Sequence, residues 1–179
     1  NGLNETEIRS PTPFFWHPHD KHDFGELQTE VVNIQRRSPA ITEHYSSSAA
    51  RGPKTIKKAE PVNHKTAEEW VSTIKEFALS HEGDDIRITT MNPLYVYEGY
   101  EIEEPWVIII GVTMDHVTLD KVPATLENPD SPAEVARQYN RAARVCRELA
   151  NFILSKGYFA KPWAGPFASA LSMVPAAID

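Results

Sequence analysis

Residues 104–116 read Glu-Pro-Trp-Val-Ile-Ile-Ile-Gly-Val-Thr-Met-Asp-His, and this stretch decides the fold. From Trp106 to Val112 no residue is charged, and β-branched residues dominate. A continuous apolar run of this kind is typical of a strand that is covered on both faces. We therefore predict that residues 106–113 form the central strand of a sheet.

Two further stretches are expected to flank this strand. Residues 86–90, Ile-Arg-Ile-Thr-Thr, alternate as a strand with one polar face does, and they are expected to pair with residues 106–113. A helical pattern at about 132–156 is followed by a short apolar stretch at 158–160. This order predicts a right-handed crossover to a parallel neighbour at about 157–161, and hence an α/β fold.

The two long helices have clear start and stop signals. Thr66 and Glu69 have the spacing of a capping box and predict a helix over residues 66–81, which Gly83 ends. Ser131, as N-cap, precedes a proline at the first helical position and a capping-box glutamate, and Gly157 ends the second helix.

The second helix is predicted to bury one apolar stripe. Its members recur at spacings of three and four: Val135, Tyr139, Ala142, Cys146, Leu149 and Ile153. Arginines mostly occupy the other side: Arg137, Arg141, Arg144 and Arg147. This series indicates either a solvated face with local ion pairs or an anion-binding face, and the ion pairs are the favoured interpretation.

Composition limits the class of protein. A chain of 179 residues with 41% hydrophobic residues suits one domain, and a net charge of -7 argues against a nucleic-acid-binding or anionic-membrane-binding surface. No apolar run approaches the roughly 20 residues of a membrane span, and no signal peptide is visible, so a cytoplasmic protein is expected. The one cysteine, Cys146, excludes an internal disulfide and favours a buried thiol over a reactive one.

Residues 1–63 differ from the rest in composition. They are rich in proline, serine and charge and show no sustained period, which predicts an extended or mobile arm before a core at 64–179. The histidines and aspartates of residues 17–23 suggest either a metal site or, preferably, a solvated loop. The aromatic residues 14–16 are expected to pack on another surface.

Two groups of side chains near the predicted sheet are candidates for a site. Asp115 and His116 follow the central strand, where α/β sheets place ligands, but their adjacency argues against a shared catalytic role and a loop start is the alternative. Tyr95, Tyr97 and Tyr100 either line a pocket or, preferably, pack over the sheet edge.

The last residues turn through two prolines and Gly165 and then become Ala-rich and helical. Small residues here allow close approach of a flat cofactor, although helix packing selects the same residues. The sequence begins at Asn1 and stops at Asp179 within the helical pattern, so a fragment of a longer protein is expected.

Several blocks together resemble a known family. They are 92–100, from Asn-Pro to Glu-Gly-Tyr; 106–115, from Trp-Val-Ile to Met-Asp; 139–160, ending Gly-Tyr-x-Ala; and 171–179, Leu-Ser-Met-Val-Pro-Ala-Ala-Ile-Asp. Over about residues 64–179 the chain resembles the N-terminal half of the corrinoid and iron–sulfur reductive dehalogenases. The resemblance implies a nitroreductase-like core, a cobalamin, two 4Fe-4S clusters from cysteines beyond Asp179, an organohalide substrate and an electron donor.

The resemblance and the small-residue turn together select four cofactor contacts: Trp163, Phe167, Ser169 and Ser172. No block contains a catalytic motif, so the catalytic residues are unknown and the chain alone is expected to be inactive. Epoxyqueuosine reductases are an alternative, but their Asp-Ser-Ala-Pro element lacks its acid in residues 163–169. A non-catalytic corrinoid-binding module is the third hypothesis.

Overall fold

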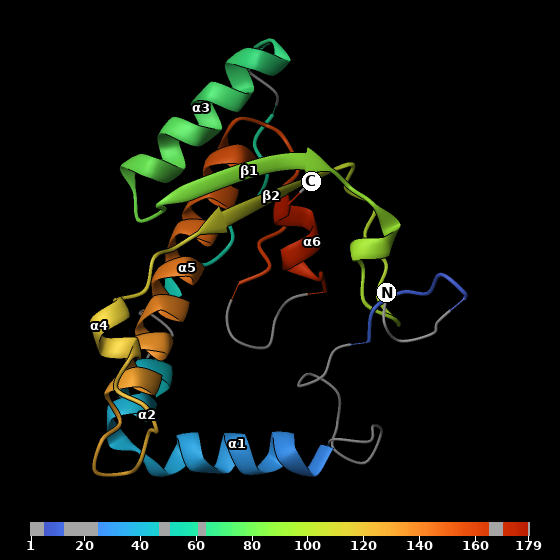
Figure 1. Cartoon of the computed structure of the whole chain (residues 1–179). Coiled ribbons are helices and arrows are strands. Elements are labelled where there is room, and N and C mark those ends of the chain that lie inside the picture. The colour runs from blue at the N-terminus through green and yellow to red at the C-terminus, as the bar shows by residue number, and fades with distance from the viewer. Residues whose placement is uncertain (1–5, 13–24, 47–50, 61–63, 165–169, 179) are drawn as a thin grey trace.

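A computed structural model describes residues 6–12, 25–46, 51–60, 64–164 and 170–178. Its elements, in chain order, are α1 (Gly25–Arg37), α2 (Pro39–Ser46), α3 (Ala67–Ser80), β1 (Asp85–Thr90), η3 (Pro93–Tyr95), β2 (Trp106–Gly111), α4 (His116–Leu119), α5 (Asp130–Ser155) and α6 (Met173–Ile178) (Figure 1). The predicted mixture of helices and strands is confirmed. No helix of the described ranges is long and apolar enough to cross a membrane.

The sheet is an antiparallel pair. β1 pairs with β2 so that Ile86 lies opposite Ile110 and Ile88 opposite Ile108. The predicted pairing of residues 86–90 with residues 106–113 is confirmed. Side chains alternate across a strand, so these four isoleucines share one face of the sheet.

Both faces of β2 are covered, as its apolar run predicted. Ile108 and Ile110 pack in a cluster formed with residues of α3 and α5, which include Ala78 and Leu149. On the opposite face, Val107 and Ile109 pack with residues of η3 and α6 and with Leu171. Figure 1 shows the sheet lying between α5 and α6. The alternation of β2 thus supplies two separate apolar clusters.

The predicted central position of β2 is wrong for the described residues. The sheet has two strands, so β2 has a strand neighbour on one side only, and residues 157–161 form no strand. Tyr158 packs edge-on against Trp70 of α3, with ring centroids 5.2 Å apart, and Phe159 is 80% exposed. The segment after α5 is therefore directed to α3 instead of returning to the sheet.

Helix α3 begins at the predicted capping box, whereas α5 begins without one. Thr66 accepts from the Glu69 N–H at 3.3 Å, and the Glu69 carboxylate accepts from the Thr66 N–H at 2.8 Å, so the capping box is confirmed. Helix α5 begins at Asp130, one residue before the predicted N-cap, and Ser131 lies inside it. Glu134 does not close a capping box, because its carboxylate accepts from the Asp115 N–H.

The buried surface of α5 is wider than the predicted stripe. Of the six stripe residues only Leu149 is fully buried. Alanines fill four of the other buried positions: Ala133, Ala136, Ala143 and Ala150. Helices α2, α3 and α4 and strand β2 all contact α5. A helix with neighbours on several sides buries more than one stripe, and alanines allow those neighbours to come close.

Part of the predicted arm is helical. Residues 25–46 form α1 and α2, so the expectation of an extended chain is wrong there. Pro39 was read as a breaker, but it occupies the first position of α2, where proline is tolerated. Ile41 is buried, and the side chain of Asn140 on α5 donates to the His44 carbonyl at 2.6 Å. The domain boundary at residue 63 stays a prediction.

Residues 51–59, which we call the strap, lie along α5 from Arg144 to Leu154. The Asn151 side chain accepts from the Ile56 N–H at 3.0 Å and donates to the Lys54 carbonyl at 2.9 Å. The Ala59 N–H donates to the Leu154 carbonyl at 2.9 Å. Gly52 has φ +89°, and a Cβ there would lie 2.9 Å from the Cα of Arg144. Only glycine allows this approach without strain.

We predict that Leu149→Ala lowers the free energy of unfolding by about 2–5 kcal/mol, because it opens a cavity in the cluster beneath the sheet. Leu79→Ala, the same change at a position of α3 that is 54% exposed, should alter it by less than about 0.5 kcal/mol. Urea denaturation measures both. Equal losses in the free energy of unfolding of the two variants would contradict the burial of Leu149 against this face of the sheet.

Asn151→Ala should release the strap, because it removes both side-chain bonds to the strap backbone. We expect trypsin to cleave after Lys54 and Lys57 about ten-fold faster in this variant. Ser155→Ala is the control, since the Ser155 hydroxyl donates within α5, to the Phe152 carbonyl. Mass spectrometry of the fragments identifies the cuts, and unchanged rates in Asn151→Ala would show that other contacts hold the strap.

Candidate functional site

The C-terminal segment lies beside the connection between β1 and β2. Leu171 forms an antiparallel bridge with Val96. The Tyr97 N–H donates to the Ala170 carbonyl at 2.9 Å, and the Ser172 N–H donates to the Tyr95 carbonyl at 2.7 Å. Residues 170–172 therefore extend the sheet region by backbone bonds, and α6 follows directly.

Trp163 lies near the same connection. Its half-buried ring meets Tyr100 edge-to-face with centroids 6.5 Å apart, and the Lys161 ammonium lies 4.4 Å from the ring centroid. We call residues 95–100, 163–164 and 170–172 the C-terminal wall. The resemblance selected Trp163 but not Tyr100.

Of the four predicted cofactor contacts, the structure places two. Trp163 and Ser172 both belong to the C-terminal wall, and Ser172 is half-buried. Phe167 and Ser169 lie outside the described residues, as do the histidine cluster at 17–23 and the aromatic residues 14–16. The assignment of these side chains to a cofactor stays a prediction.

The tyrosines of the connection differ in burial. Tyr95 is 4% exposed and belongs to the cluster that covers Val107 and Ile109. Tyr100 is 44% exposed and reaches Trp163. The preferred interpretation, packing over the sheet, holds for Tyr95. Tyr100 is the ring that remains accessible to a ligand.

Asp115 and His116 form a helix start and not a catalytic pair. The Asp115 carboxylate caps α4 by accepting from the Thr118 N–H at 2.7 Å. Hydrogen bonding to the Thr118 side chain, and next to its backbone N–H, lowers the pKa of Asp115. Both residues are exposed. The alternative of a loop start is therefore the better account of these residues.

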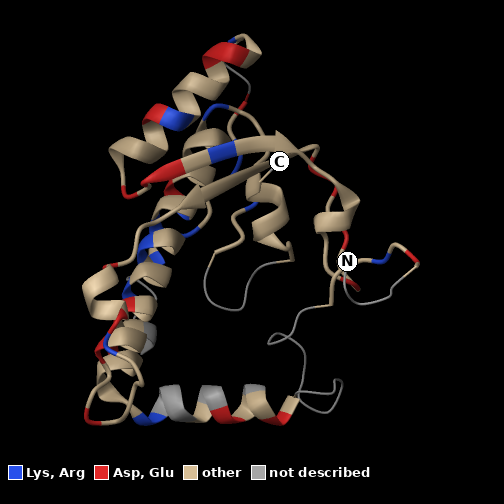
Figure 2. Cartoon of the chain, viewed as in Figure 1, with Lys and Arg blue, Asp and Glu red and all other residues tan. Residues whose placement is uncertain are grey.

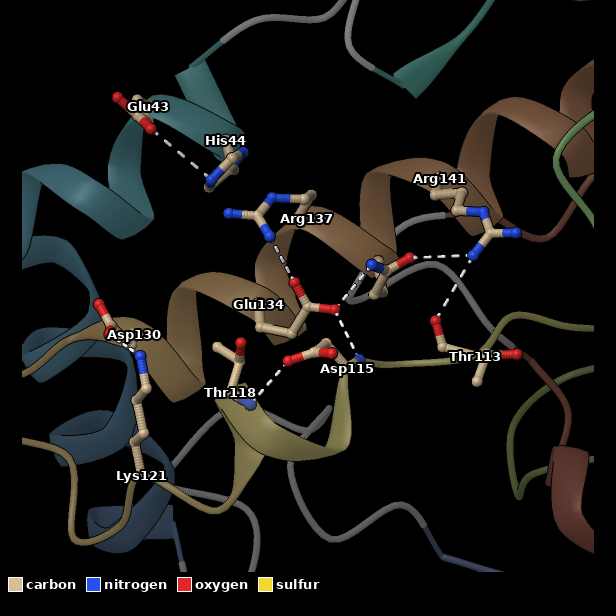
Figure 3. Close-up of polar contacts among 11 residues, drawn as sticks. Glu43, His44, Thr113, Asp115, Thr118, Lys121, Asp130, Glu134, Arg137 and Arg141 are labelled. Atoms are coloured by element: carbon tan, nitrogen blue, oxygen red, sulfur yellow. Dashed lines mark hydrogen bonds and ion pairs between the residues drawn. The ribbon is translucent and has the colours of Figure 1, made fainter.

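Glu134 is the buried acid beside this helix start (Figure 3). It is 1% exposed, and its carboxylate accepts from the Asp115 N–H at 2.9 Å, from the Gln138 amide at 2.8 Å and from Arg137 at 2.5 Å. The bond from the Asp115 backbone is the main cause that lowers the Glu134 pKa. Both carboxylate oxygens have a donor, and the group joins α5 to the start of α4.

Two further ion pairs fasten α5 to the turn before β1. Arg144 forms a two-pronged pair with Glu82 at 2.6 and 2.7 Å, and Arg141 lies 2.6 Å from Asp84. Asp84 also accepts from the Thr113 N–H at 2.6 Å, and these bonds, led by that of Arg141, lower its pKa to about 2. Figure 2 shows Lys and Arg residues recurring along α5. Arg137, Arg141 and Arg144 make ion pairs, but the pairs of Arg141 and Arg144 are made with residues distant in sequence and not with local ones.

Cys146 does not suit cluster ligation. Burial raises the pKa of its thiol to about 11, and the sulfur lies 3.9 Å from the Trp163 carbonyl oxygen. A 4Fe-4S cluster requires four thiolates, and this sequence has one cysteine. The described residues also contain no group of three or more histidine, cysteine or acidic residues that could hold a metal ion.

The C-terminal wall combines two aromatic rings with short side chains. The rings are those of Tyr100 and Trp163, Ala164 and Ser172 are half-buried, and Ala170 is fully buried. A shallow hollow of about 330 Å³ lies elsewhere on the described surface, among Glu7, Arg9 and Leu94. A corrinoid needs walls on several sides, and the assignment of such a ligand to these residues stays a prediction.

Comparison with known proteins identifies no family. The chain matches no protein-family model, and a search of curated proteins finds no significant relative. The resemblance described from the sequence blocks is therefore the basis of any functional assignment.

We predict that Glu134→Ala lowers the free energy of unfolding by about 1–3 kcal/mol at neutral pH, because it leaves the Asp115 N–H without its acceptor. Glu134→Gln keeps an acceptor but loses the charge, so it should lower the free energy of unfolding by less than Glu134→Ala. Glu76→Gln, at an exposed position of α3, should change little.

The pH dependence of Glu134→Gln gives a separate check. Folding lowers the Glu134 pKa, so the charge stabilises the fold above the unfolded pKa of about 4.3 and loses this effect as pH falls through the folded pKa. The difference in the free energy of unfolding between wild type and Glu134→Gln should therefore be largest near neutral pH and should become small at acidic pH. A difference independent of pH would show that the charge is unimportant.

Proposed function

We propose that the chain is part of a cobalamin-dependent, 4Fe-4S-containing reductive dehalogenase-like oxidoreductase, which cleaves carbon–halogen bonds reductively. The observation that supports this proposal is that three of the resembling blocks lie together. Residues 171–178 are distant in sequence from residues 92–100 and from β2, but they pack with both through the Val96–Leu171 bridge and a shared apolar cluster. Blocks that carry a resemblance and share one region are consistent with a common site.

The C-terminal wall is the part of the chain that we assign to the corrinoid. Trp163 and Tyr100 would pack against the ring system, and the short side chains of Ala164 and Ser172, both half-buried, would let the backbone approach it. Cobalamin, when bound, supplies a reducing cobalt centre. The residues of this chain bind and orient it and keep water from one face. The iron–sulfur clusters do not fit this chain, since Cys146 is its one cysteine, and they require cysteines elsewhere.

The test is equilibrium dialysis of the 179-residue chain against excess hydroxocobalamin. We expect weak binding that Trp163→Ala abolishes, because this change removes the larger ring of the wall. Trp70→Ala is the matched control, since the Trp70 ring packs on Tyr158. Weak binding should not survive gel filtration, because one wall does not enclose the ligand.

Two outcomes would contradict the proposal. If no binding depends on Trp163, even with excess cobalamin, then the C-terminal wall does not bind the corrinoid. Stoichiometric cobalamin retained through gel filtration would instead identify a complete corrinoid-binding module. Circular dichroism of both tryptophan variants separates loss of binding from loss of folding.

A further inference from the structure

The C-terminal end of α5 carries a basic surface that the proposed function does not use. The strap places Lys54, Lys57 and Lys58 over the last turns of α5, because Asn151 and Leu154 bond to its backbone. All three lysines are exposed, and Lys156 follows directly after α5. We call these four lysines, together with Phe159, the lysine–phenylalanine patch.

Phe159 is the apolar member of this patch. Its side chain is 80% exposed, and the Lys58 ammonium lies 5.0 Å from its ring centroid. The same ammonium donates to the Gly157 carbonyl at 3.4 Å, so the strap and the segment after α5 are joined at this point. An accessible aromatic ring bordered by charge has the composition of a binding hot spot with a polar rim.

The lysines of the patch are not used for internal ion pairs. Arg137, Arg141 and Arg144 of α5 each pair with a carboxylate, whereas no ion pair within the described residues includes a lysine of the patch. Glu60 follows the strap, and Glu68 and Glu69 begin α3 nearby. The patch itself carries four positive charges on a chain of net charge -7.

We propose that the lysine–phenylalanine patch docks an acidic surface of a partner protein, with Phe159 entering an apolar contact at its centre. At physiological ionic strength charges are screened over about 8 Å, so the local charge decides the contact and not the net charge of the chain. Asn151 holds the strap backbone at Lys54 and Ile56, and Lys58 is held by the Gly157 carbonyl, so the segment that carries the three lysines is fixed to α5 at both ends.

An anionic bilayer fits the same patch less well. A bilayer is a wide plane, and the chain that carries the four lysines has a net charge of -7, whereas an acidic patch on a protein needs to meet only the lysines. One strongly exposed ring also offers little apolar area for insertion, and stable membrane binding usually needs a second signal. We therefore take the protein as the partner.

The test uses a fluorescent synthetic peptide in which glutamates flank a central leucine, titrated with the whole chain by anisotropy. The triple variant Lys54→Gln, Lys57→Gln, Lys58→Gln should bind about ten-fold more weakly, with each lysine contributing part of the loss. The matched control is Lys75→Gln, Arg87→Gln, Lys121→Gln, which removes the same charge elsewhere and should bind as wild type. Phe159→Ala keeps all charges and should also weaken binding about ten-fold.

Three results would overturn the proposal. The first is equal loss in both triple variants, which would mean general charge attraction. The second is an unchanged affinity of Phe159→Ala, and the third is binding to phosphatidylserine vesicles but not to the peptide. If the patch variant does not fold by circular dichroism, carbodiimide coupling of the peptide to the wild-type chain decides the question. Mass spectrometry should then find the peptide on patch lysines, and coupling at Lys75 and Lys121 to the same extent would contradict the docking surface.

Discussion

Strand β2 is apolar on both faces, and this constraint organises the described part of the chain. Water must be excluded from Ile108 and Ile110 on one side and from Val107 and Ile109 on the other. Helices α3 and α5 cover the first side. The second is covered by η3, residues 170–171 and α6, which come from opposite ends of the sequence region 92–178. Burial of one strand thus brings distant segments together.

The polar groups at the end of β2 follow from the same burial. When β2 ends against α5, the backbone beyond it needs partners, and a buried N–H without an acceptor is costly. The Glu134 carboxylate accepts from the Asp115 N–H, and the Asp84 carboxylate accepts from the Thr113 N–H. Two carboxylates therefore bond to the backbone that follows β2. Arg137 and Arg141 then balance these acids. The arginines of α5 are used to fasten the sheet.

The sequence was a good guide where local rules decide the structure. The capping box of Thr66 and Glu69, the alternation at Ile86 and Ile88, and the apolar run of β2 each depend on near neighbours, and each was predicted correctly. The place of β2 in the sheet depends on where the chain goes after α5. Tyr158 finds Trp70 on α3, a contact between distant residues that no periodicity reveals.

The candidate site was harder to foresee for the same reason. Glu134 was read as a local cap, but its partner Asp115 lies 19 positions earlier in the chain. Trp163 was selected by resemblance, whereas Tyr100, its partner in the wall, was only one of three tyrosines in a loop. Helices α1 and α2 were missed because proline density was given more weight than helix-forming residues, although Pro39 is at a permitted position.

The C-terminal wall and the stability of the fold share their residues, and this limits how function can be separated from folding. Leu171 is buried against Val96 while its neighbours Ala170 and Ser172 bond to the backbone of residues 95–97. A change at any of these positions alters the cover of β2 as well as the wall. Trp163 differs, because its ring is half-buried and meets Tyr100 outside the two apolar clusters. Its side chain is therefore the position at which ligand contact can be removed with least effect on the sheet.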